Sequence, residues 1–166
     1  MIWFDYQMIR QSNHRSQLIE KLGRLITVSQ TETHEVDEAA AAQLGINRTD
    51  LRCLGIVLEH EPISASMIAK NAGLTRGAMT TALDRLERAG LVRRIDDPLD
   101  RRGVNVEATL SAKKAVRDIW GPIRTDGLAL LKEYGDEEIE LLDRFFDEYR
   151  SLQHSHAERI RHLKRR

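Results

Sequence analysis

The chain has 166 residues, 41% of them hydrophobic, so it can bury one substantial core in one or two compact units. Charged residues make up 31% of the chain, but 26 basic and 26 acidic side chains cancel, so the net charge does not identify a nucleic-acid partner. No stretch approaches the roughly 20 apolar residues of a membrane span or the core of a signal peptide, so we expect a soluble, cytoplasmic protein with no membrane partner.

The first 44 residues read as a long helical arm. Leucines recur at three- and four-residue spacing with charged residues between them, as at Leu18, Leu22 and Leu25. The acidic stretch over residues 32–38 predicts a kink or break. An apolar stripe of this length at one end of a small protein is typical of a surface that packs against a partner. Residues 1–46 are therefore predicted to be an N-terminal dimerisation arm.

A strongly apolar second helix is predicted from Asn47 onward. Asn47 followed by Asp50 resembles a helix N-cap with an acidic residue at the third position. Leu51 and Leu54 then lie on one face of a helix apolar enough to be central to the core. Pro62 ends this helix.

The next segment has a helix-turn-helix layout. Ser64 can cap a short helix, Gly73 lies in the turn, and Thr75 can cap a second helix that ends at Gly90. The buried face of the second helix is predicted from apolar residues at i, i+3, i+4 and i+7, namely Met79, Ala82, Leu83 and Leu86. In DNA-binding proteins with this layout, the second helix enters the major groove.

The face of the second helix opposite Met79, Leu83 and Leu86 carries Gly77, Thr80, Thr81, Asp84 and Arg88. Hydroxyls can donate to phosphates or reach base edges, arginines can reach phosphates or guanine, and glycine allows a close approach. The DNA contacts predicted here are Thr75, Arg76, Gly77, Thr80, Thr81 and Arg85. Any amphipathic helix has a polar face, so this segment alone leaves DNA binding and protein binding equally open.

A β-hairpin is predicted next. Two stretches with strand character, residues 91–95 and 104–109, flank a polar, turn-rich loop. Arg101 and Arg102 lie at its tip, where slender cations suit the negative potential of a narrow minor groove. Asp100 can pair with Arg102 and orient its guanidinium. The alternative is a solvated polar turn.

Two further helices complete the chain. Ser111 is the predicted cap of the first, in which Pro122 predicts a kink or break, and Asp136 opens the last. The predicted fold is mainly α with a small β-hairpin wing. It consists of a winged helix-turn-helix domain over residues 47–110, with helical dimerisation arms on both sides, the second over residues 111–166.

Two segments carry a resemblance to a known family. Residues 74–93 (LTRGAMTTALDRLERAGLVR) resemble the recognition helix and first wing strand of the MarR family of bacterial and archaeal regulators, and residues 97–102 (DPLDRR) resemble its wing signature. The resemblance implies a homodimer in which the first and last helices of the two chains intertwine. It also implies that this dimer binds a pseudo-palindromic operator, usually as a repressor. It also implies that Arg102 is the minor-groove arginine and Asp100 its orienting partner.

The same resemblance implies a small-molecule effector, whose pocket we expect to be bordered by His60 and Trp120. The chain departs from the family pattern at Lys114, where the family usually has glycine, and in its long arm before Asn47. Neither departure touches the residues predicted to contact DNA.

The sequence gives little support for redox sensing, metal binding or catalysis. Cys53 is the single cysteine, and its apolar surroundings predict a buried, unreactive thiol rather than a redox switch. His154 and His156 are two residues apart on a helix and do not share a face, so no metal site is expected. No phosphate-binding loop or catalytic motif is present, so we predict neither an enzyme nor a cofactor. The competing interpretation is a winged-helix protein-interaction module that does not bind DNA.

Overall fold

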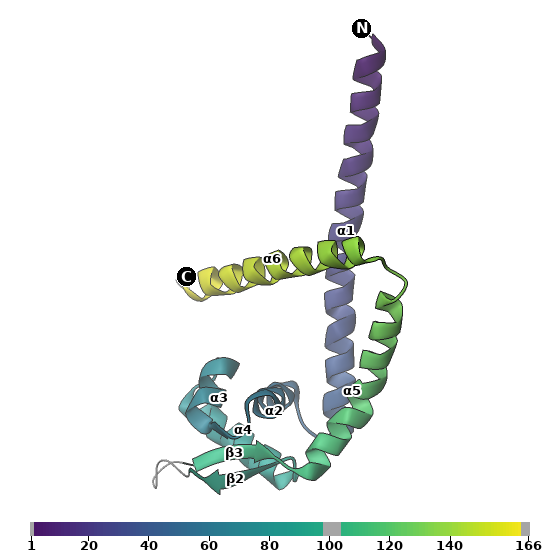
Figure 1. Cartoon of the computed structure of the whole chain (residues 1–166). Coiled ribbons are helices and arrows are strands. Elements are labelled where there is room, and N and C mark those ends of the chain that lie inside the picture. The colour runs from purple at the N-terminus through teal and green to yellow at the C-terminus, as the bar shows by residue number, and fades with distance from the viewer. Residues whose placement is uncertain (1, 98–103, 164–166) are drawn as a thin grey trace. The chain divides into compact units, whose positions relative to one another are not determined.

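The computed structural model describes residues 2–97 and 104–163, with side chains from His14 onward, as two units, residues 1–116 and 117–166 (Figure 1). The first unit contains α1 (Ile2–Gln43), α2 (Arg48–His60), β1 (Ile63–Ser64), α3 (Ala65–Ala72), α4 (Arg76–Arg88), β2 (Val92–Asp96) and β3 (Val104–Ala108). α5 (Leu110–Leu131) begins in the first unit and continues into the second, which also contains α6 (Asp136–Arg161). The predicted mainly α, winged helix-turn-helix fold is confirmed.

α1 is one uninterrupted helix of 42 residues (Figure 1). The break predicted over residues 32–38 is wrong, because this stretch holds no proline or glycine and its glutamates favour helix. Ala40 and Ala41 are buried near the C-terminal end of α1. The helix then stops at Gly45, which adopts a left-handed backbone with φ +68°, and the Ile46 N–H donates to the carbonyl of Ala41 at 2.9 Å.

The helices α2, α3 and α4 share one core with the strands β1, β2 and β3, and these six elements are called the winged unit below. Apolar side chains converge from every element between α2 and the start of α5, and the largest fully buried ones include Leu54, Ile68, Met79, Leu83 and Leu86. Four of the five come from α2 and α4, so these two helices form the centre of the core. The outer surface of α4 is thereby turned to solvent.

Local capping sets the starts of the three short helices, as predicted. Asn47 accepts from the Asp50 N–H at 2.9 Å, Ser64 from the Met67 N–H at 3.4 Å, and Thr75 from the Ala78 N–H at 3.3 Å. Gly73 closes α3 with φ +66°, the left-handed conformation that glycine adopts without strain. These signals place the turn between α3 and α4 within a few residues.

The predicted hairpin belongs to a three-stranded antiparallel sheet with the order β1-β3-β2. Val92 pairs with Ala108 and Asp96 with Val104, so the two long strands are in register up to the base of the wing. β1 was not predicted, because it has only two residues and Ser64 also caps the following helix. Ile63 pairs with Val106 and seals the core against the sheet.

The start of α5 differs from the prediction by two residues. Thr109, rather than Ser111, is the cap: its Oγ1 accepts from the Ala112 N–H at 3.1 Å and donates to the Gly90 carbonyl at 2.7 Å. The prediction of Ser111 was wrong because the hydrogen bond that anchors Thr109 crosses to the end of α4, which the local sequence does not reveal. Pro122 does not break the helix, which continues to Leu131.

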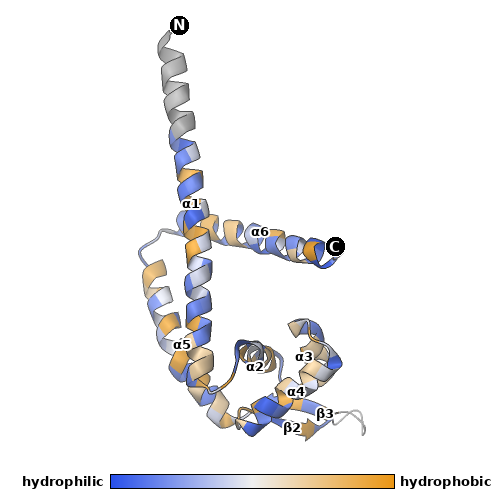
Figure 2. Ribbon diagram, turned by 180° about the vertical axis from the view of Figure 1, so that it is seen from behind, coloured by the Kyte–Doolittle hydropathy of each residue, from blue (hydrophilic) through white to orange (hydrophobic). Residues whose placement is uncertain are grey.

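α6 begins at Asp136 as predicted, and Glu138 accepts from the Gly135 N–H at 2.9 Å. Leucines of α1 remain about half exposed, including Leu18 at 52% and Leu25 at 51%. In α6, Leu141 is 58% and Phe146 59% exposed. Figure 2 shows hydrophobic residues recurring along both helices. No helix among the described residues is long and apolar enough to cross a membrane.

Candidate nucleic-acid interface

The outer face of α4 gathers five of the predicted DNA contacts on one exposed surface. Met79, Ala82, Leu83 and Leu86 point into the core. The exposed residues that we call the outer face are Gly77, Thr80 and Thr81, on the side opposite the core, and Thr75 and Arg76, at the start of the helix. Among the described residues Arg76 forms no ion pair, so its charge is available to a ligand.

The threonines of the outer face are held by their own helix. The Thr80 hydroxyl donates to the Arg76 carbonyl and the Thr81 hydroxyl to the Gly77 carbonyl, both at 3.1 Å. The hydroxyl oxygens keep lone pairs that can accept from a base amino group, and the methyl groups can contact thymine.

Neither packing nor backbone conformation within the chain requires glycine at position 77. A Cβ built there meets no atom within 4 Å, and its φ is not positive. Glycine inside a helix costs about 1 kcal/mol relative to alanine. The absence of a side chain at Gly77 leaves the backbone of α4 open to a close approach by another molecule.

Arg85 is the exception among the predicted contacts of α4. Its Nε donates to Oδ2 of Asp50 at 2.7 Å and its Nη2 to Oδ1 at 2.6 Å. This hydrogen-bonded pairing raises the pKa of the Arg85 guanidinium, so the side chain stays charged. The pair joins α4 to the first turn of α2. A DNA contact by Arg85 remains a prediction.

Asp50 was interpreted from the sequence only as a capping residue. Its side chain is 1% exposed, and it also accepts from Nδ2 of Asn47 at 2.9 Å. The available signal was a carboxylate beside the apolar face of a core helix, because such a group requires a partner when it is buried. Nothing in the local sequence identifies that partner, since Arg85 is 35 residues away.

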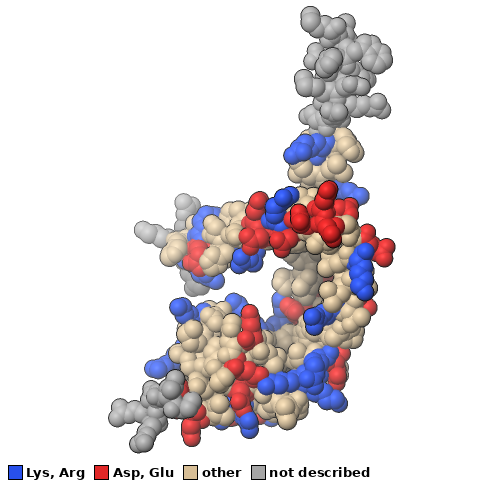
Figure 3. Space-filling view, viewed as in Figure 1, with Lys and Arg blue, Asp and Glu red and all other residues tan. Residues whose placement is uncertain are grey.

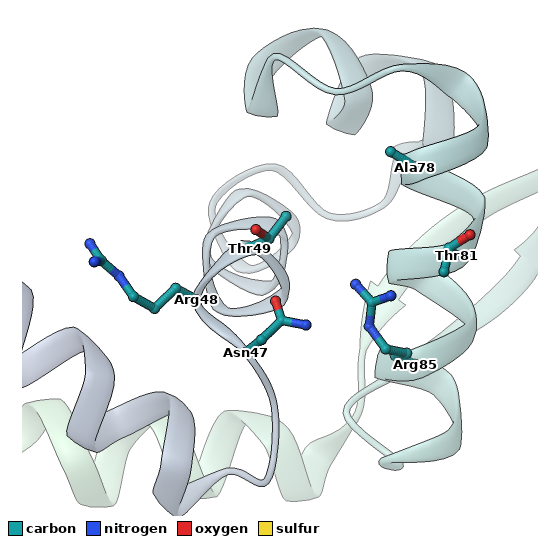
Figure 4. Close-up of a pocket in the computed structure, with 6 residues that line it drawn as sticks. All are labelled: Asn47, Arg48, Thr49, Ala78, Thr81 and Arg85. Atoms are coloured by element: carbon teal, nitrogen blue, oxygen red, sulfur yellow. The ribbon is translucent and has the colours of Figure 1, made fainter.

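Asn47 and Arg85 line two open clefts beside α2 and α4. One, of about 520 Å³, is lined by Asn47, Arg48, Thr49, Ala78, Thr81 and Arg85 (Figure 4). In Figure 4, Asn47 and Arg85 point into the gap between the helices, whereas Arg48 points away from α4. The other, of about 480 Å³, includes Asp50 and Arg88. The outer face therefore continues into a polar cleft beside the N-terminus of α2.

A second set of ion pairs joins α4 to the wing. Arg94 on β2 pairs with Asp84 at 2.5 Å and also with Glu87, both on α4. The hydrogen bond to Asp84 raises the pKa of Arg94. Arg93 pairs across the strands with Glu107. On the face seen in Figure 3, acidic and basic side chains are accordingly interspersed over the winged unit.

The other candidate residues are spread over the chain. Asp100, Arg101 and Arg102 lie outside the described residues. His60 is exposed at the end of α2, Trp120 is half-buried on α5 in the second unit, and neither lines the two clefts above, so the effector pocket remains a prediction.

Cys53 is fully buried, and burial raises the pKa of its thiol, which disfavours the reactive thiolate. Within the described part of the chain, no group of three or more His, Cys, Asp or Glu side chains could hold a metal ion.

Comparison with known proteins agrees with this architecture. The profile of the MarR family matches residues 46–104. A Bacillus subtilis (strain 168) protein, described as the uncharacterized HTH-type transcriptional regulator YcgE, is 35% identical over 149 residues, which cover 90% of this chain and 97% of the relative. The chain belongs to the MarR family.

Solved structures place the MarR-family fold over most of the chain. Escherichia coli MarR in its apo form is 25% identical with a TM-score of 0.56, covering 77% of this chain and 96% of that one. Streptococcus pneumoniae FabT, solved in complex with DNA, is 18% identical with a TM-score of 0.68, covering 82% of this chain and 97% of that one. At 18% identity the likeness to FabT concerns the fold.

Proposed function

We propose that this MarR-family protein is a sequence-specific DNA-binding transcription regulator, acting as a repressor, that binds a pseudo-palindromic operator in double-stranded DNA as a homodimer. The observation that carries the proposal is the outer face of α4, an exposed surface of small, hydroxyl and basic side chains on the second helix of a winged helix-turn-helix. The description of a relative that matches nearly the whole chain as an HTH-type transcriptional regulator supports it.

In this proposal the N-terminal half of α4 enters the major groove, which is about 12 Å wide and admits a helix. The first N–H groups of α4 and the guanidinium of Arg76 face phosphates, because a helix N-terminus favours negative charge. Thr80 and Thr81 meet base edges, and Gly77 allows the backbone to come close. None of these contacts requires the core face of α4 to move.

The wing completes the interface. Antiparallel pairing of β2 and β3 up to Asp96 and Val104 holds the two ends of the loop together, and Arg94 on β2 is paired with Asp84 on α4. Arg101 and Arg102 then reach the adjacent minor groove, and Asp100 orients Arg102. FabT, which has the same fold, was solved with DNA.

Association into a homodimer accounts for the apolar surfaces of the arms. Half-exposed leucines recur along α1, and α6 exposes Leu141 and Phe146. A two-fold axis gives both subunits the same buried surface and matches the symmetry of a palindromic operator. Sedimentation at micromolar concentration should give a dimer mass, and a monomer would contradict this part of the proposal.

We propose that a small-molecule effector controls DNA binding by changing the separation of the two recognition helices. The two recognition helices must lie about one DNA turn, roughly 34 Å, apart. A ligand that binds better to another spacing therefore weakens DNA binding by its differential affinity for the two states. We propose that the protein acts in this way in the cytoplasm, without a cofactor and without catalysis of its own.

The test is selection of duplex fragments by the purified full-length protein, followed by sequencing at a stated salt concentration. We expect enrichment of a pseudo-palindrome with half-sites about one turn apart. Arg102→Ala should lower duplex affinity at least tenfold, whereas Lys132→Ala, which removes a cation outside the winged unit, should change it less than twofold. No enrichment by a folded dimer would refute the proposal and favour the protein-interaction module.

A further inference from the structure

Asp50 is the one charged side chain that is buried among those described. Its carboxylate accepts three hydrogen bonds, two from Arg85 and one from Asn47, at 2.6–2.9 Å. Asn47 in turn accepts from the Asp50 N–H, so the same two residues cap α2 and accept the hydrogen bonds from α4. Every polar group of this network therefore has a partner inside the chain.

A bidentate pair of this kind specifies geometry more than it adds stability. Apolar side chains of similar volume would pack α2 against α4 at least as favourably as a buried ion pair does. The two parallel N–H···O bonds instead fix the direction and plane of the Arg85 guanidinium. Because Arg85 follows Thr81 by one helical turn, fixing it sets how far α4 is rotated and advanced relative to α2.

The pair also controls the charge beside the outer face. The guanidinium is 37% exposed, at the wall shared by the two clefts, so its field could reach a nearby phosphate. The Asp50 carboxylate, less than 3 Å away, offsets that field at the distance of a ligand. Arg76, which forms no ion pair with any other described residue, keeps its charge available to DNA.

We propose that Asp50 is a positioning residue for α4: through Arg85 it sets the orientation of the outer face and withholds the charge of that arginine from DNA. Discrimination between the operator and other DNA sequences then depends on Thr80, Thr81 and Gly77 rather than on the attraction of Arg85 to phosphates, which is the same for every sequence. The inference rests on the proposed DNA-binding function. It differs from the sequence-based prediction, in which Arg85 contacts DNA directly.

The test compares variants of the full-length protein by fluorescence anisotropy. Each binds its selected operator and a scrambled duplex of equal length over a series of salt concentrations. The slope of log K against log salt counts the phosphates neutralised, at about 0.9 for each one. Far-UV circular dichroism establishes that each variant is folded.

Asp50→Asn keeps the shape of the side chain and releases the charge of Arg85. We expect a slope on scrambled duplex steeper by about 0.9, several-fold tighter scrambled binding at low salt, and at least a threefold loss of operator preference. Glu59→Gln, on the same helix and with the same change of net charge, is the matched control and should leave all three values within error.

The double variant Asp50→Asn with Arg85→Gln replaces the ion pair with two amides. Its slope should equal that of the wild type, because the paired arginine neutralises no phosphate. A slope smaller by about 0.9 would mean that Arg85 contacts a phosphate directly and would overturn the proposal.

Asp50→Asn should not weaken binding to the operator and to the scrambled duplex by the same factor with an unchanged slope. That result would show that Asp50 has a structural role alone, and it would also overturn the proposal. If the wild type binds no duplex, the proposed function fails first, which separates the two failures.

Discussion

Substitution of Leu86 by alanine separates the role of α4 in the fold from its role in the interface. Leu86 is fully buried in the core of the winged unit, on the side of α4 opposite the outer face. The substitution removes three carbons at about 0.8 kcal/mol each, and incomplete collapse of the cavity raises the loss to about 3–4 kcal/mol. The free energy of unfolding should fall by that amount.

The matched change is Thr80→Ala on the outer face. Its hydroxyl donates only to a carbonyl of its own helix, so its loss should change stability by less than about 0.5 kcal/mol. Urea unfolding followed by circular dichroism measures both effects, at one protein concentration because association shifts the midpoint. Operator affinity of the protein that remains folded should fall for Thr80→Ala and change little for Leu86→Ala.

The opposite pattern would refute this division of α4. If Thr80→Ala destabilises the chain by 2 kcal/mol or more, the outer face is part of a packed surface. If Leu86→Ala leaves the urea midpoint unchanged, the core described for the winged unit is wrong.

Three further predictions concern caps and pH. Thr75→Ala should cost about 1 kcal/mol by removing the cap of α4, whereas Thr75→Ser should retain it, as urea unfolding measures. Thr109→Ala should destabilise by about 1–2 kcal/mol and Ser111→Ala by much less in the same assay, and equal effects would contradict the assignment of the cap. Burial raises the pKa of Cys53 above its ordinary value of 9.0, so the unfolded chain loses this proton first. The free energy of unfolding should therefore fall as pH rises above 9, and less steeply in Cys53→Ala.

The sequence predicted those features that depend on near neighbours. The caps at Asn47, Ser64 and Thr75 act within three residues, and the buried face of α4 follows from its apolar spacing. The outer face was predictable for the same reason, since it is the remainder of that helix.

Features that join distant segments were missed. Asp50 and Arg85 meet across 35 residues, and the Thr109 hydroxyl reaches Gly90 across 19. Arg94 was predicted only as a strand residue, yet it binds α4 through Asp84 and Glu87. Such pairings depend on the packing of whole elements, and the pattern within either element does not identify the partner.

The outer face of α4 has a consequence for how such a protein changes over evolutionary time. Its exposed side chains are not part of the core, and the ion pairs described for α4 come from other positions along the helix. Substitutions at Thr80 or Thr81 therefore meet little selection from folding. After gene duplication, one copy could acquire a new target site through a few mutations at these positions while retaining its scaffold.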